Sequence, residues 1–164
     1  MNLKPLKTAG LVSLVMGILF ALTGAITWGV ITAQLSDERI TTPGDSFMPG
    51  VAVNNPIAAL AQADIINKHA LKASNGMTYA QLGAEANKAK AAGDTAKAEE
   101  LTKQRTTVMN GSFLRASLFT SVLAYGVSLF ALGVGAVLIV LGWALTKVGG
   151  QTVAARAGEG AARV

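Results

Sequence analysis

The sequence predicts an all-α membrane hairpin, in which two transmembrane helices are joined by a mostly helical extracytoplasmic loop domain. The first observation behind this prediction is that residues 8–36 and 116–146 contain no charged side chain. Each stretch exceeds the roughly 20 residues that a helix needs to cross a bilayer. The second observation is a content of only 14% charged residues in a chain of 164 residues, against about 25% in a typical soluble domain. The composition therefore argues against a soluble globular protein.

The first elements are a short cytoplasmic lead over residues 1–7 and a transmembrane helix over residues 8–34. The apolar run of this helix is longer than the roughly 7–15 residues of a signal peptide. The sequence Ile-Thr-Ala at residues 31–33 is also a poor cleavage site, so we expect the helix to be retained. Trp28 lies toward its outer end, where an indole ring suits the membrane interface.

The segment 35–112 is predicted to be an extracytoplasmic loop that contains short helices. Residues 35–55 hold several proline and glycine turn signals and should be extended. A helix should begin at Pro56, because Asn55 can cap it and proline suits the first helical position. The sequence Ser-Asn-Gly at residues 74–76 favours the end of this helix.

Two further helices are expected in the loop. Thr78 and Gln81 have the spacing of a capping box, which predicts a helix over about residues 79–92. Asp94 can cap the next helix, which should extend over residues 95–109. No strand pattern or internal repeat is found along the chain.

The last part of the chain should contain the second transmembrane helix, over residues 113–147. The sequence Asn-Gly-Ser at residues 110–112 should break or bend the chain before it. Trp143 lies toward the inner end of this helix. Residues 148–164, which are rich in alanine and glycine, are predicted to form a disordered cytoplasmic tail.

The distribution of charge predicts the orientation of the hairpin. Two lysines precede the first span, and Lys147, Arg156 and Arg163 stand against Glu159 after the second. The segment 37–115 is nearly balanced, with nine basic and eight acidic residues. Because short flanks rich in Lys and Arg stay in the cytoplasm, both termini are expected inside and the loop outside the plasma membrane. The basic residues form no stripe, so no nucleic-acid partner is expected.

Each span carries a row of small residues at helical spacing, which we call a small-residue seam. Small side chains allow helices to approach closely inside a bilayer, and heptad spacing favours left-handed packing. Either the two seams pack on each other, or at least one faces another protein. The first seam consists of Gly10, Ser13, Gly17, Ala21 and Gly24, and the second of Ser117, Ser121, Ala124, Ser128, Ala131, Gly135 and Gly142.

The chain contains few residues of the types that catalyse reactions or bind metals. It has no cysteine, and His69 is its single histidine. The uncharged stretches 8–36 and 116–146 contain no Asp, Glu, Lys, Arg or His, the residues that mark ion paths and substrate sites in membranes. We therefore predict no catalytic residue, no cofactor and no metal site. Phe47, His69 and Tyr79 are the candidates for contact with a partner, since aromatic side chains contribute strongly at interfaces.

Three stretches resemble a group of small two-pass membrane proteins from actinobacteria: residues 61–71 (AQADIINKHAL), 76–82 (GMTYAQL) and 112–121 (SFLRASLFTS). Proteins of this kind often carry the label of aromatic ring-opening dioxygenase. Such enzymes hold iron with two histidines and a carboxylate, and the single His69 does not supply that set. Similar small proteins are accessory subunits of actinobacterial respiratory supercomplexes. The resemblance thus implies components of a cytochrome bcc/aa3 oxidase as partners.

These observations lead to two hypotheses about function. The first is a non-catalytic accessory or assembly subunit of a plasma-membrane complex, plausibly the respiratory cytochrome supercomplex. It would act by packing its spans against other membrane helices and by docking its loop on a partner. The second is a stand-alone envelope sensor or ligand-binding membrane module.

Overall fold

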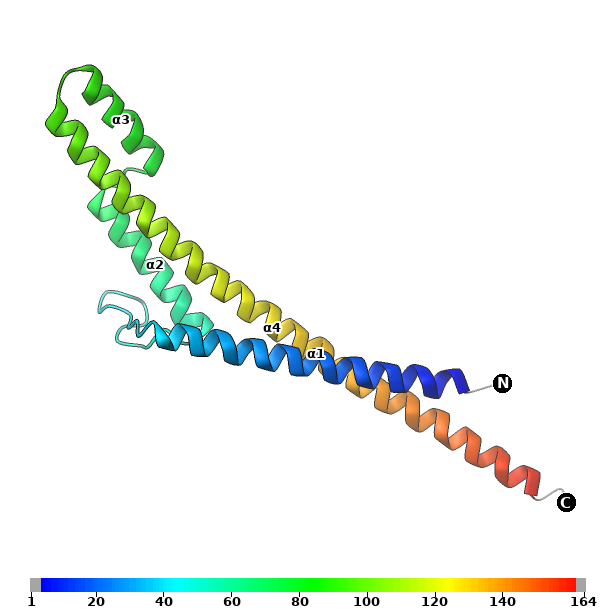
Figure 1. Ribbon diagram of the computed structural model, residues 1–164. Coiled ribbons are helices and arrows are strands. Elements are labelled where there is room, and N and C mark those ends of the chain that lie inside the picture. The colour runs from blue at the N-terminus through cyan, green and yellow to red at the C-terminus, as the bar shows by residue number, and fades with distance from the viewer. Residues whose placement is uncertain (1–3, 162–164) are drawn as a thin grey trace. The chain divides into compact units, whose positions relative to one another are not determined.

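The computed structural model describes the backbone of residues 4–161 and the side chains of residues 5–150. The chain forms four helices, α1 (Lys4–Asp37), α2 (Pro56–Ala73), α3 (Tyr79–Ala91) and α4 (Thr95–Ala161) (Figure 1). The described residues form no strand, and a single isolated bridge joins Thr41 to Ala52. The prediction of an all-α chain is confirmed.

The chain divides into two compact units. The hairpin unit consists of residues 1–30 and 125–164, and it contains most of α1 and the second part of α4. The central unit consists of residues 31–124, and it contains the end of α1, all of α2 and α3, and the first part of α4.

Two helices are long and apolar enough to cross a membrane. They are α1, over Pro5–Asp37, and α4, over Thr95–Gly150. The 34 residues of α1 extend over about 51 Å at about 1.5 Å per residue, which exceeds the hydrocarbon thickness of about 30 Å.

The starts of α2 and α3 follow the predicted capping residues. The Asn55 side-chain oxygen accepts hydrogen bonds from the backbone N–H groups of Ile57 (3.1 Å) and Ala58 (2.9 Å). At the start of α3, Thr78 and Gln81 form both halves of the capping box. These bonds satisfy backbone donors that a helix start otherwise leaves without partners.

The helix ends in the central unit depend on two glycines with left-handed backbone. Gly76 has φ +79°, and its N–H donates to the Leu71 carbonyl at 2.7 Å, which ends α2. Gly93 has φ +78° in the turn from α3 to α4. Both positions favour glycine because a Cβ is strained there. The Asp94 side chain then accepts from the Lys97 N–H at 3.0 Å and caps α4 as predicted.

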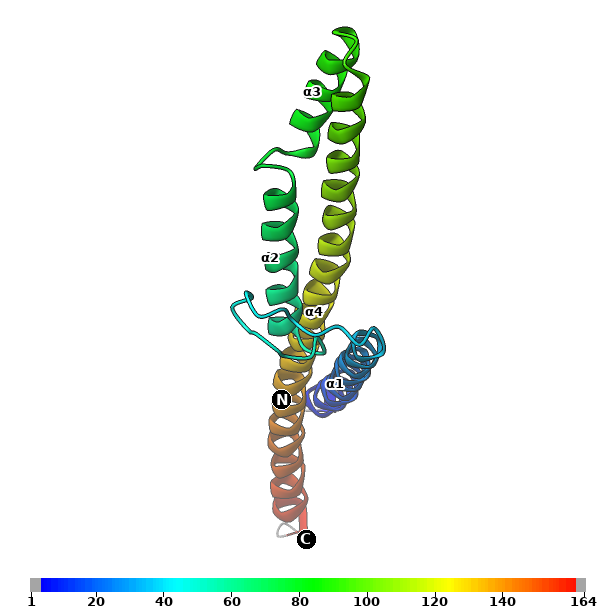
Figure 2. The same cartoon turned by 90° about the vertical axis from the view of Figure 1, so that its left-hand side faces the viewer.

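The central unit has a narrow core rich in alanine. Figure 2 shows α2 and α3 lying along the first part of α4. The packing of α3 on α4 buries Leu82, Ala86, Ala89, Ala98, Leu101 and Val108, with Met77 beside them. The buried face of α2 consists of Ala58, Ala59, Ala61, Ala63 and Ile65.

The predicted break or bend at residues 110–112 is not a break, because α4 is continuous there. The Ser112 hydroxyl donates to the Val108 carbonyl at 3.0 Å and so stays within the helix. Gly111 is buried where α2 meets α4, and a Cβ built on it would lie 3.2 Å from the Cβ of Ala70. The glycine therefore serves close packing between helices instead of a turn.

Helix α4 continues into the segment 148–164, for which the sequence predicts a disordered tail. The segment is helical as far as Ala161, and residues 162–164 lie outside the described part. Residues 151–161 contain no proline and four alanines. Alanine has the highest helix propensity, whereas Gly158 and Gly160 each disfavour the helix by about 1 kcal/mol relative to alanine.

Candidate functional site

The two small-residue seams meet in the hairpin unit at three glycine positions. A Cβ built on Gly10 would lie 2.9 Å from the Gly142 carbonyl oxygen, and one on Gly17 would lie 2.8 Å from that of Gly135. A Cβ on Gly24 would lie 2.7 Å from the Ser128 carbonyl oxygen. No side chain larger than hydrogen fits at these distances without a shift of the backbone. The contacts recur every seven residues in opposite directions along α1 and α4, so the helices pack as an antiparallel pair.

Polar and aromatic contacts accompany the glycine contacts. The Ser13 hydroxyl donates to the Leu138 carbonyl at 3.0 Å. The Trp28 ring packs edge to face on the Tyr125 ring, with 4.7 Å between their centroids, and Tyr125 is only 1% exposed. Trp28, predicted to be an interface anchor, therefore also packs inside the hairpin unit.

The remaining seam residues fall into two groups. Ala21 and Ala131 are half-buried in the hairpin unit, and a Cβ on Gly135 would lie 2.7 Å from the Ala21 nitrogen. Ser117, Ser121 and Ala124 belong to the central unit, where they line a cavity. The second seam thus packs against α1 over residues 128–142, and over residues 117–124 it borders the cavity.

This cavity, of about 510 Å³, lies among the end of α1, α2 and α4 within the central unit. Its polar lining consists of the carboxylate of Glu38, two amides and three hydroxyls (Gln34, Gln62, Ser117, Thr120 and Ser121). The Gln62 side-chain oxygen is fully buried and has no hydrogen-bond partner among the described residues. We call this space the central cavity. Its lining comprises Ile31, Gln34, Leu35, Glu38, Ile40, Gln62, Ile66, Leu114, Ser117, Leu118, Thr120, Ser121 and Ala124.

The three predicted partner contacts have different surroundings. Phe47 is 55% exposed in the loop between α1 and α2. His69 Nε2 lies 2.7 Å from the Asp45 carboxylate, which ties this loop to α2. The hydrogen bond from His69 holds the pKa of Asp45 below its ordinary value. Tyr79 remains partly exposed, and the guanidinium of Arg105 lies 4.0 Å from the centre of its ring.

Several contributing residues were not singled out from the sequence. Asp45 pairs with His69, 24 residues away, and Arg105 packs on Tyr79, 26 residues away. No local sequence pattern predicts contacts over such separations. Arg115 donates from Nη1 to the Asn67 side-chain oxygen at 2.8 Å and so joins α4 to α2. Its position as the last charge before the apolar run is the only sequence signal that it carries.

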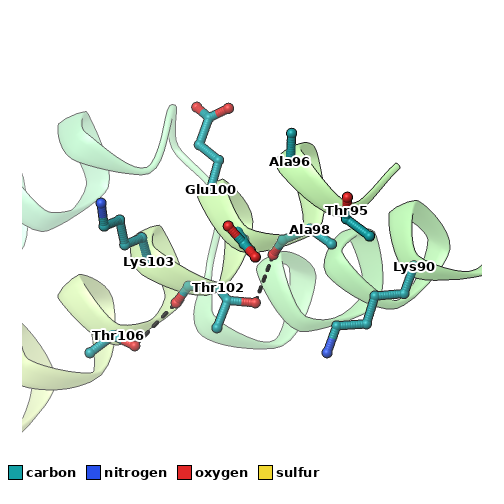
Figure 3. Close-up of a pocket in the computed structure, with 9 residues that line it drawn as sticks. Lys90, Thr95, Ala96, Ala98, Glu100, Thr102, Lys103 and Thr106 are labelled. Atoms are coloured by element: carbon teal, nitrogen blue, oxygen red, sulfur yellow. Dashed lines mark hydrogen bonds between the residues drawn. The ribbon is translucent and has the colours of Figure 1, made fainter. Parts of the chain in front are cut away.

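A second, shallow pocket of about 810 Å³ lies on the surface formed by α3 and α4 (Figure 3). Thr102 and Thr106 line it, and their hydroxyls donate to the carbonyls of Ala98 (2.7 Å) and Thr102 (3.1 Å) in their own helix. In Figure 3 the charged ends of Lys90, Glu100 and Lys103 do not converge on a common point. These three charged side chains therefore do not form a common binding point.

Among the described residues, no group of three or more His, Cys, Asp or Glu side chains is placed to hold a metal ion. Comparison of the chain with known protein families, with characterised proteins and with solved structures finds no match.

Proposed function

We propose that the chain is a non-catalytic accessory subunit of a plasma-membrane complex, with α1 and α4 as its membrane spans. The observation that carries this proposal is a set of large apolar side chains on the central unit outside the predicted spans. Phe47, Ile57 and Leu60 are 55%, 60% and 42% exposed. Exposed apolar surface of this kind favours contact with another protein. The narrow, alanine-rich core of the central unit also suits a unit that lies on a partner.

The proposed topology has both termini in the cytoplasm and residues 35–112 outside. Its support is that the basic ends of the two spans are neighbours in the hairpin unit. A Cβ on Gly149 would lie 3.3 Å from the Cβ of Lys7, and Lys147 is two residues away along α4. Lysines at one end of both spans favour the cytoplasmic side for that end.

For the partner we propose components of a respiratory cytochrome bcc/aa3 supercomplex. The support for this choice is the resemblance of residues 61–71, 76–82 and 112–121 to small actinobacterial two-pass proteins. An accessory subunit needs no catalytic group of its own. It needs a surface that binds a partner.

The proposal is tested by extraction of the C-terminally tagged protein in a mild detergent. Native size, co-purifying proteins and the haem absorbance spectrum are recorded together. A large particle with cytochrome bands is the expected result, and a small colourless particle without other proteins would overturn the proposal.

A pair of variants tests the surface itself. The double variant Ile57→Ser, Leu60→Ser should release the partner, because it removes two exposed apolar side chains from α2. The control is Ala80→Ser, Ala84→Ser, which introduces the same two serines at exposed positions of α3 without removing a large apolar side chain. Equal recovery of the complex with both double variants would contradict a docking role for this face of α2.

A second candidate function is a ligand-binding membrane module, and the central cavity is the observation that favours it. Its volume of about 510 Å³ lies within the range of roughly 300–1,000 Å³ common for small-molecule sites. This function needs no partner, so ligand binding by the purified small particle would distinguish it from the first.

A further inference from the structure

We propose that the hairpin unit binds an anionic phospholipid at the end where α1 begins. One acyl chain lies in a groove along α1, and the lipid phosphate pairs with the lysines Lys7 and Lys147. The inference requires α1 and α4 to be membrane spans, but it does not require docking of the central unit on a partner.

The groove, which we call the hairpin groove, runs along α1 from Pro5 to Phe20 and is bordered on α4 by Leu138. Its volume is about 920 Å³. Phe20 and the other apolar side chains in its deeper part remain partly exposed. The hydroxyl in that part, on Ser13, donates to the Leu138 carbonyl at 3.0 Å, so this donor already has a partner. The deeper part of the groove therefore suits a hydrocarbon chain.

The length of the hairpin groove matches one leaflet of a bilayer. From Pro5 to Phe20 the helix rises about 23 Å, at about 1.5 Å per residue. A bilayer with its headgroup layers is about 40–45 Å thick, so one leaflet measures about half of that. A transmembrane helix of another protein would contact α1 through both leaflets, whereas a lipid occupies only one. The groove therefore fits a lipid better than a partner's helix.

The charge at the shallow end of the groove selects the headgroup. The hairpin unit contains no Asp or Glu in residues 4–30 or 125–150. Lys7 lies between Pro5 and Thr8, which both line the groove, and its side chain is exposed. An exposed lysine without a carboxylate in its own unit attracts an anion. In the proposed topology this end faces the cytoplasm, where the leaflet carries anionic lipids.

A second lysine lies at the same end of the hairpin unit. A Cβ on Gly149 would lie 3.3 Å from the Cβ of Lys7, and Lys147 precedes Gly149 by two residues on α4. The Lys147 Nζ lies 5.8 Å from the centre of the Trp143 ring, and tryptophan favours the membrane interface. Both lysines therefore lie at the level of the headgroups, where the phosphate of a lipid in the groove is also found.

The two lysines favour a headgroup with a net negative charge. Phosphatidylcholine and phosphatidylethanolamine carry the same phosphate, but each also carries a cationic group that lysine repels. Phosphatidylglycerol has the phosphate without that cation. The charge of the hairpin unit therefore discriminates between lipids whose acyl chains are identical.

The test compares three lipids that share their acyl chains. The full-length protein is purified in a non-denaturing detergent with equal amounts of dioleoyl phosphatidylglycerol, phosphatidylcholine and phosphatidylethanolamine, and bound lipid is measured by native mass spectrometry. Phosphatidylglycerol should exceed each of the others about fivefold, the order expected for a lysine near a charged membrane surface. Equal binding of all three, a preference for a zwitterionic lipid, or no retained lipid would each overturn the proposal.

Variants locate the headgroup at the two lysines. The double variant Lys7→Gln, Lys147→Gln should abolish the preference for phosphatidylglycerol, and Lys7→Arg, Lys147→Arg should keep it because the charge remains. The control Lys90→Gln, Lys103→Gln removes two exposed lysines from the central unit and should leave the preference unchanged. An equal loss in the two glutamine variants would show a general effect of net charge and contradict this site.

A variant of the groove tests the position of the acyl chain. Ala9→Leu adds bulk at a lining position and should lower retention of phosphatidylglycerol about threefold. The control Ala25→Leu makes the same change at an exposed position of α1 outside the groove. Circular dichroism and gel filtration confirm that both variants remain helical and monodisperse. Undiminished retention in a folded Ala9→Leu protein would contradict the groove as the site of the chain.

A competitor distinguishes a lipid site from a simple phosphate site. Glycerol 3-phosphate carries the phosphate without an acyl chain, so an equal amount should not displace phosphatidylglycerol. Displacement would show that the phosphate binds without the groove and would overturn the proposal. The docking test above measures native size and co-purifying proteins, so the two proposals fail independently.

Discussion

At the scale of single residues, glycine determines how closely α1 and α4 pack in the hairpin unit. Inside a bilayer no hydrophobic force drives helices together, so their association depends on close contact and hydrogen bonds. The Gly10, Gly17 and Gly24 positions leave no room for a Cβ. By contrast, Gly126 and Gly133 lie in the same part of α4 with open space around them. Residue type alone does not separate these two classes of glycine.

The first prediction uses this contrast. Gly17→Ala should destabilise the hairpin unit by about 1–3 kcal/mol, because the added methyl overlaps the Gly135 carbonyl at 2.8 Å. The control Gly133→Ala adds the same methyl in open space, where alanine should stabilise the helix by up to about 1 kcal/mol. Thermal unfolding in detergent, followed by circular dichroism, measures both. Equal shifts in the two variants would show that the seams do not pack as described.

The second prediction concerns the Asp45–His69 pair. The hydrogen bond from His69 lowers the pKa of Asp45 from its ordinary value of 3.8. A folded-state pKa below the unfolded value stabilises the fold above the unfolded pKa, and this contribution is lost as the pH falls through the folded pKa. An NMR titration of the carboxyl carbons should therefore place Asp45 below 3.8 in the native protein.

The variant His69→Ala should raise the pKa of Asp45 toward its ordinary value. Glu85 serves as the internal control, because the hydrogen bond from Lys88 lowers its pKa independently of His69. An Asp45 titration that does not respond to His69→Ala would exclude the pair in solution.

At the scale of elements, the helix starts could be predicted because their causes are local. Asn55 with Pro56, and Thr78 with Gln81, satisfy backbone groups within a few residues, so the sequence alone contains the necessary information. The sequence predicts a break or a bend at residues 110–112, and the break does not occur, because Gly111 allows a close contact with Ala70 on another helix. Local signals cannot tell a glycine for a turn from a glycine for packing.

The third prediction tests the core between α3 and α4. Leu82→Ala should remove about 2–5 kcal/mol of packing energy, because Leu82 is fully buried in a narrow core. Amide hydrogen exchange in α3 should then become at least tenfold faster, since about 1.4 kcal/mol corresponds to a factor of ten. The control Leu60→Ala changes a leucine that is 42% exposed on α2. Exchange in α3 that is as slow as in the native protein would contradict this packing.

At the scale of the whole molecule, composition predicts the fold class and long-range packing determines the site. Uncharged stretches indicate the two long apolar helices, and small residues indicate where close packing is possible. The central cavity could not be predicted, because Glu38, Gln62 and Ser117 lie on three separate segments. Gln62 is an ordinary helix residue in the sequence. That its side-chain oxygen has no hydrogen-bond partner among the described residues becomes evident only once α2 lies against α4.

The last prediction tests the proposed topology by labelling introduced cysteines. Because the chain has no native cysteine, only the introduced residue can react. Ala91→Cys, at an exposed position of α3, should react with a membrane-impermeant maleimide in intact cells. Gly150→Cys, exposed near the basic end of the spans, should react only after the cells are opened. The physical reason is that lysines next to a span keep that end in the cytoplasm, whereas a long loop crosses regardless of its charge. Labelling of Gly150→Cys in intact cells, with protection of Ala91→Cys, would reverse the orientation and place the central cavity on the cytoplasmic side. Labelling of both variants in intact cells would mean that residues 91 and 150 lie on the same side of the membrane.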